Sequence, residues 1–162
     1  MKIRRRSLLS DDARAALPLE PGEKAIAAAL GDAGWVVATG RALVTSSGRM
    51  PWTEVAHAQW YDEEQVLAVD PVAGEGQRLL IRLAEPGRLP ETVHERVMAS
   101  IVLSRRVAVP GGGGVRLVAR RGQGRDPVRW QVVPDDGTDL AAPGVQEFVD
   151  DALARLRGEL GA

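Results

Sequence analysis

The stretch RMPWTEVAHAQWYDEEQVLAVDPVAGEGQRLLIRL, residues 49–83, decides the fold. It holds a Trp-containing run over residues 50–61, the polar turn Asp62-Glu63-Glu64, and apolar runs at residues 65–69 and 78–83. Short apolar runs separated by turn residues predict antiparallel strands joined by hairpins. Residues 89–102 follow with a proline at the start and an apolar stripe at helical spacing, which predicts a helix. We therefore expect an antiparallel sheet capped by a helix.

Upstream of this stretch, the sequence predicts a short helix and three strands. Ser10 is expected to cap a helix over residues 11–17, because its side chain can accept a hydrogen bond from the first turn. Residues 24–30 fit either a helix or a strand, since alanine favours helices and the short length favours a strand; the strands that follow favour the strand. Gly40-Arg41 lies between two apolar runs and predicts a tight hairpin turn.

Downstream, residues 115–121 and 128–133 predict a hairpin, and residues 145–160 carry an apolar stripe that predicts an amphipathic helix. The end of the helix over residues 89–102 stays open, because residues 101–109 also fit a strand. The expected fold class is α+β, with an antiparallel, partly barrel-like sheet capped by a helix, then a β-hairpin and a C-terminal amphipathic helix. We expect an N-terminal arm (1–19), a sheet-and-helix part (20–103) and a C-terminal part (104–162) packed on the same domain.

Residues 20–103 resemble the bacterial pleckstrin-homology-like domains. The resemblance rests on Glu20-Pro21-Gly22-Glu23 before the first strand, on a second strand led by Trp35, and on Met50-Pro51-Trp52-Thr53-Glu54-Val55. It implies a half-open antiparallel barrel closed by a helix, and binding of lipid headgroups, peptides or protein partners rather than catalysis. The whole chain also resembles small proteins of actinobacterial type, which implies no particular activity.

The first inter-strand loop departs from the lipid-binding members of that family. In those members the loop carries lysines and arginines that hold phosphate. Here it reads Gly31-Asp32-Ala33-Gly34, with one acid and no base. This composition argues against a phosphoinositide ligand.

Composition limits the chemistry and the compartment. The chain has 162 residues and a net charge of −1. It contains no cysteine, and this absence excludes disulfides, thiolate catalysis and thiolate metal sites. The basic start is followed by only Leu8 and Leu9, whereas the apolar part of an export signal spans about 7 to 15 residues. No stretch approaches the length of a membrane span. We expect a cytoplasmic protein with no membrane span.

Motifs for catalysis and metal binding are missing. His57 and His94 lack the spacing of a histidine metal site, and Glu91 is expected to form a surface ion pair with His94. No nucleophile elbow is present. The glycines at residues 111–114 precede a strand rather than the Lys-Ser/Thr of a phosphate loop, so they predict a turn. We predict no catalytic residue, no metal site and no cofactor.

One basic surface stands out. Residues 101–130 carry seven arginines against one aspartate, while residues 131–162 carry seven acidic residues against two arginines. Strand alternation puts Arg116, Arg120 and Arg129 on one face of the predicted hairpin, where guanidinium groups could bind an anion or an acidic partner. Alternatively, the basic hairpin and acidic tail neutralise each other within the fold or across a homodimer. The slightly acidic balance and few Tyr and Phe residues argue against nucleic acid.

The missing chemistry favours a non-catalytic, cytoplasmic binding or interaction module that recognises a protein or peptide. A sheet edge that accepts an extended strand is the expected mode. The alternative hypothesis is a small-molecule or anion-binding protein, or a cryptic enzyme, that uses the arginine face.

Overall fold

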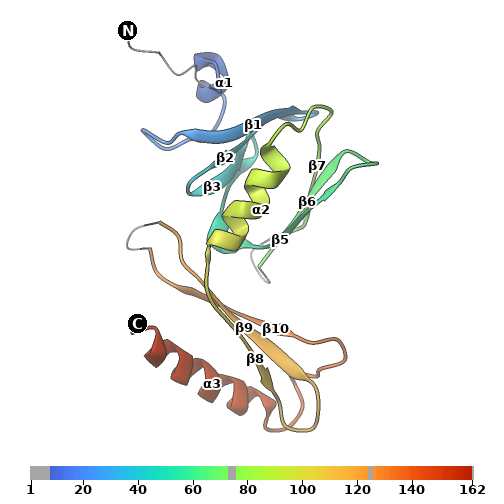
Figure 1. The fold of residues 1–162 in the computed structure, drawn as a ribbon, viewed down its shortest axis with the longest axis vertical. Coiled ribbons are helices and arrows are strands. Elements are labelled where there is room, and N and C mark those ends of the chain that lie inside the picture. Colours follow the sequence, from blue (N-terminus) through green and yellow to red (C-terminus); the bar gives the residue numbers. More distant parts are fainter. Residues whose placement is uncertain (1–7, 73–75, 124–125, 162) are drawn as a thin grey trace. The chain divides into compact units, whose positions relative to one another are not determined.

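The computed structural model describes residues 8–72, 76–123 and 126–161. The chain forms two compact units, one made of Met1–Ser100 with Gly122–Arg125 and one made of Ile101–Arg121 with Asp126–Ala162. Figure 1 shows the sheets and helices of each unit. Within these residues, three antiparallel sheets and their helices confirm the predicted α+β class, and none of the three sheets closes into a barrel. The expected packing of the C-terminal part on the same domain stays a prediction.

The first sheet contains the four strands β1 (Ala25–Gly31), β2 (Gly34–Thr39), β3 (Ala42–Thr45) and β4 (Gly48–Pro51), in that order. β1 settles the ambiguity at residues 24–30 in favour of a strand. The turn at Gly40-Arg41 joins β2 to β3 as predicted, with Ala38 opposite Leu43. The loop over residues 31–34 joins β1 to β2.

Both faces of this sheet are covered, which explains the continuous apolar runs in its strands. Val36 and Ala38 belong to the core shared with the second sheet, while Val37 points to the other face. That other face is covered by Leu9 and Ala13, from the segment around helix α1 (Asp11–Ala15), which Ser10 caps through a 3.2 Å bond from the Ala13 N–H.

The second sheet contains β5 (Val55–Tyr61), β6 (Val66–Pro71) and β7 (Leu79–Arg82), with β6 in the middle. The expected continuous run over residues 50–61 is wrong in one respect. After β4 the chain forms a single 3-10 turn, η1 (Trp52–Glu54), before β5 begins. Trp52 is buried in this turn and its indole N–H donates to the Thr39 carbonyl at 2.8 Å, so the interruption places the indole in the core.

Helix α2 (Leu89–Ala99) packs against β5, β1 and β2 and fills the core of the first unit with Leu89, Val93 and Val97. The structure settles the end of this helix, which the sequence left open. The helix stops at Ala99, and Ser100 caps it by donating its hydroxyl to the Val97 carbonyl at 2.6 Å. Strand β8 begins at Ile101, so the strand-like reading of residues 101–109 is correct.

The second unit is a three-stranded sheet with one helix. Strand β9 (Gly114–Arg120) lies between β8 (Ile101–Ala108) and β10 (Arg129–Pro134). Helix α3 (Val145–Glu159) packs its apolar stripe on the face that carries Val115, Leu117 and Trp130. The predicted hairpin and amphipathic helix are therefore confirmed, with β8 as a third strand. No helix within the described ranges is long and apolar enough to cross a membrane.

Candidate functional site

The residues with catalytic potential do not converge. His57 lies 3.6 Å from Asp70, between Nδ1 and Oδ2, and Asp70 also pairs with Arg78 at 3.0 Å. Glu91 pairs with Arg88 at 3.9 Å, so the expected ion pair with His94 is wrong. Within residues 8–72, 76–123 and 126–161, no three acidic or histidine side chains are grouped to hold a metal. The glycines at 111–113 have positive φ angles and turn the chain from β8 into β9, as predicted.

The three predicted arginines share one face of the second unit's sheet. Arg129 lies directly opposite Arg120, and Arg116 lies four residues before Arg120 in β9, opposite Arg106. Helix α3 packs on the other face, so it does not cover them. Arg120, however, is only 4% exposed, whereas Arg116 on the same strand is exposed. Burial lowers the pKa of its guanidinium. The anion site at Arg116, Arg120 and Arg129 stays a prediction.

Part of the charge asymmetry is neutralised inside the second unit. Arg105 pairs with Glu159 of α3 at 3.0 Å, and Arg106 pairs with Asp135 at 2.6 Å. Both pairs join the basic sheet to the acidic tail, which is the internal alternative that the sequence left open. Homodimer formation through these charges stays a prediction.

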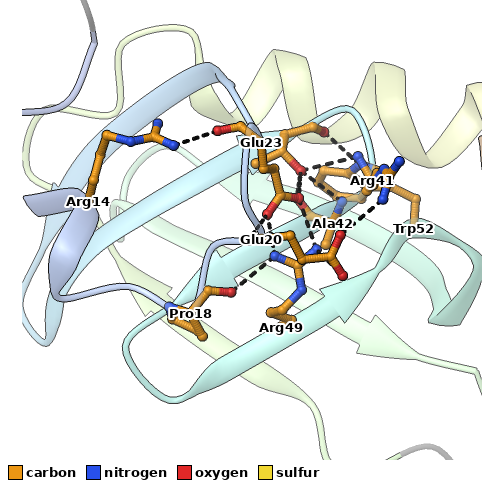
Figure 2. A network of polar contacts seen from close by, with 9 residues as sticks. Arg14, Pro18, Glu20, Glu23, Arg41, Ala42, Arg49 and Trp52 are labelled. Carbon is orange, nitrogen blue, oxygen red and sulfur yellow. Dashed lines mark hydrogen bonds and ion pairs between the residues drawn. The ribbon is translucent and has the colours of Figure 1, made fainter.

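A buried polar cluster around Glu23 joins the turn before β1 to three strands (Figure 2). The Glu23 side chain is 4% exposed and accepts hydrogen bonds from the Thr39 hydroxyl at 2.7 Å and from Arg49 at 2.9 Å. The backbone N–H of Glu20 donates to the same carboxylate at 3.0 Å. Thr39 also accepts from the backbone N–H groups of residues 41 and 42 at 3.1 Å. The carboxylate is therefore fully engaged inside the fold.

The environment of Glu23 stabilises its charged form. Burial alone raises the pKa of the carboxyl, but the hydrogen bonds it accepts, above all from Arg49, outweigh burial. The pKa of Glu23 falls from 4.5 to about 2, and the hydrogen bond to Glu23 raises the pKa of Arg49. A carboxylate with this pKa stays ionised at neutral pH and is a poor proton acceptor. We assign this cluster to stability rather than to binding or catalysis.

A groove lies between β5 and α2. It has a volume of about 660 Å³, and its walls come from consecutive residues of β5 and from the beginning of α2. The lining residues are His57, Ala58, Gln59, Trp60, Asp62, Leu67, Pro86, Gly87, Pro90, Glu91 and His94. β5 is an edge strand, so the groove follows an edge of the second sheet.

The register of the sheet shows which backbone groups of β5 face this groove. The Val72 N–H donates to the Glu54 carbonyl at 2.7 Å, so the even-numbered residues of β6 direct their backbone groups towards β5. In the regular ladder, Ala68 lies opposite Gln59 and Val66 opposite Tyr61. Because bonded and non-bonded pairs alternate along an antiparallel ladder, Ala58 and Trp60 direct their N–H and C=O groups away from β6. Neither residue has another backbone partner in the described parts of the chain.

The opposite edge of the same sheet is less suited to binding. β7 has four residues, compared with seven in β5. A Cβ at Gly31 would lie 3.1 Å from the Arg82 carbonyl oxygen, so the end of β1 already crowds that edge. A hollow of about 270 Å³ remains there between the loop at residues 31–34 and β7. The β5 edge therefore has the longer and more open backbone.

No family model, curated protein or solved structure matches this chain. The resemblance to pleckstrin-homology-like domains stays a prediction, and the function must be inferred from the molecule's own geometry.

The sequence did not reveal the groove. Its residues come from two segments, 57–67 and 86–94, that only the packing of α2 on β5 brings together. One signal was present: His57 and Gln59 alternate with Ala58 along the strand, which indicates a sheet with one face exposed. Alternation cannot show which strand is at the edge, because edge position depends on long-range pairing.

Proposed function

We propose that this chain is a binding module that captures an extended peptide segment of a protein partner by strand addition to β5. The observation that carries the proposal is the orientation of Ala58 and Trp60, whose backbone groups face the groove instead of β6. Their backbones offer two N–H donors and two C=O acceptors along the same strand edge. An added strand needs such a row, and its main-chain hydrogen bonds supply affinity without fixing the partner's sequence.

Groove side chains would supply selectivity. In a strand added to β5, alternate side chains point to the same face as Ala58 and Trp60, and this face belongs to the core side of the sheet. Leu67 and Pro90 also line the groove and are apolar. We expect apolar or flat side chains at those alternate positions of the peptide. The intervening side chains would lie beside His57 and Gln59, which are exposed.

The architecture supports the same proposal. A four-stranded sheet, a three-stranded sheet and a helix follow one another in the chain, and antiparallel strands followed by a helix are what the resemblance to pleckstrin-homology-like domains implies. Peptide and protein binding are among the functions of that fold. The arginine face is the weaker candidate, because the buried side chain of Arg120 divides it.

A proline substitution at the groove edge tests strand addition. Random dodecapeptides displayed on phage are selected against the full chain, and an enriched peptide is synthesised. We expect Ala58→Pro to reduce its affinity at least about tenfold, because proline removes an outward N–H and places its ring in the path of the added strand. Fluorescence anisotropy measures the affinity, and near-ultraviolet circular dichroism checks the fold.

Gln59→Pro is the matched control. Its N–H points to β6, so proline there removes a hydrogen bond of the sheet and lowers the unfolding free energy by about 1 to 3 kcal/mol. If Ala58→Pro also unfolds the chain, N-methylation of alternate peptide residues gives the same test from the ligand side. N-methylation of the peptide residues whose N–H groups point to β5 should abolish binding, and N-methylation of the residues between them should not. Failure to enrich any peptide, or equal binding by Ala58→Pro, contradicts the proposal.

A further inference from the structure

The groove between β5 and α2 carries a carboxylate on each wall. Asp62 follows β5 on one wall, and Glu91 lies in the first turn of α2 on the other. The described lining includes no lysine or arginine, although the chain contains 21 such residues. Arg88 offsets Glu91 only weakly, because the two side chains are 80% and 64% exposed and lie 3.9 Å apart. An acidic or phosphorylated segment would meet repulsion along this edge.

Trp60 and Asp62 together form a surface suited to a guanidinium group. The indole Nε1–H of Trp60 donates to Oδ1 of Asp62 at 3.2 Å, which fixes the carboxylate beside the ring. No bond to the second carboxylate oxygen of Asp62 is found in the described parts of the chain. An arginine can stack on the face of an aromatic ring and donate to a neighbouring carboxylate at the same time.

We propose that the segment bound along β5 carries an arginine that stacks on Trp60 and pairs with Asp62. This inference rests on the proposed strand addition and adds the chemistry of the partner, which is an extended cationic stretch of a protein. Side chains directly opposite each other in an antiparallel pair have Cβ atoms about 4.5 to 5.5 Å apart. The arginine therefore belongs at the peptide position opposite Trp60, with Glu91 attracting it from the other wall.

The selected dodecapeptides provide the first test. We expect arginine to be enriched at one position, with apolar residues two places away on the same face. A synthetic peptide with that arginine is then compared with its citrulline analogue, which keeps the shape and removes the charge. Citrulline should weaken binding about fivefold to tenfold, as expected for one charge-assisted contact at a partly exposed site.

Charge variants of the chain locate the contact. Asp62→Asn should weaken binding of the arginine peptide about fivefold and leave binding of the citrulline peptide nearly unchanged. Glu91→Gln should have a smaller effect in the same direction. Glu147→Gln is the matched control, because it removes an exposed carboxylate from α3 in the second unit and should not change the affinity.

The outcomes separate this inference from the proposal on which it rests. Enriched peptides without arginine, or equal effects of Asp62→Asn and Glu147→Gln, overturn the cationic partner. Strand addition would still stand in that case if Ala58→Pro abolished binding. If no peptide is enriched, or if Ala58→Pro binds as well as the unmodified chain, both proposals fall.

Discussion

Two sets of polar groups in the first unit contrast in how they are satisfied. Around Glu23, the carboxylate, the Thr39 hydroxyl and the Arg49 guanidinium bond to one another inside the fold. Along β5, the outward backbone groups of Ala58 and Trp60 have no backbone partner among the described residues. The first set lies in a place where water has little access, and the second lines an open groove.

The comparison shows how burial separates stabilising groups from binding groups. A buried polar group without a partner costs about 1 to 3 kcal/mol, so a buried cluster must be complete within the chain. An edge that faces solvent is satisfied by water, and those hydrogen bonds can be exchanged for bonds to a peptide at little net cost. The same kind of atom therefore stabilises the fold at Glu23 and remains available for a partner at β5.

The largest effect is expected from Glu23→Gln. The change keeps the size of the side chain but removes the buried charge that pairs with Arg49, whose own side chain is only 22% exposed. Breaking a buried pair by removing one partner costs about 3 kcal/mol. Urea unfolding followed by tryptophan fluorescence measures the change, because Trp35, Trp52 and Trp60 lie in the first unit.

Glu20→Gln is the control for that substitution. Glu20 is 49% exposed and lies 3.8 Å from the same Arg49, so its loss should change the unfolding free energy by less than about 1 kcal/mol. Equal effects of the two substitutions would show that the Glu23 cluster is not the stabilising centre and would remove the contrast with β5. Neither substitution should affect peptide binding.

The second largest effect is a loss of stability in acid. The folded pKa of Glu23, about 2, lies below its ordinary value of 4.5, so the unfolded chain binds this proton more readily. The resulting stabilisation is complete above about pH 5 and decreases as the pH falls from about 4.5 towards 2. Between pH 7 and pH 3 this amounts to about 2 kcal/mol.

Urea unfolding at a series of pH values measures this loss. Glu23→Gln should flatten the curve between pH 5 and pH 3 by about the same 2 kcal/mol. A curve of unchanged slope in the variant would assign the acid sensitivity to other carboxylates.

The sequence predicted local elements well, because hairpins and caps depend on neighbouring residues. Gly40-Arg41 marked its turn, and Ser10 marked its helix. It failed where tertiary packing decided the outcome. At Trp52, burial of the indole interrupts the run over residues 50–61. The end of α2, which the sequence left open, lies at the hydroxyl cap of Ser100.

The candidate sites show the same division. Alternation in β9 and β10 correctly placed three arginines on one face. It could not show that Arg120 would be buried while Arg116 on the same strand is exposed, because the burial of a side chain depends on what packs over it. The groove at β5 was likewise hidden, since its two walls are separated in sequence and neither carries a motif.

The smallest effect is expected from Arg41→Ala, which sharpens the distinction between buried and exposed pairing within one cluster. Arg41 pairs with Glu20 at 3.0 Å, a good ion-pair geometry, but the two side chains are 61% and 49% exposed. Water and salt screen such a pair, so the unfolding free energy should fall by no more than about 0.5 kcal/mol. The Arg41 backbone N–H, which donates to Thr39, is unchanged by the substitution.

Urea unfolding at low and high salt measures the difference, which should disappear at about 1 M salt. A loss as large as that of Glu23→Gln would mean that distance rather than burial sets the strength of these pairs. Burial would then not distinguish the polar groups of the Glu23 cluster from those along the open edge of β5.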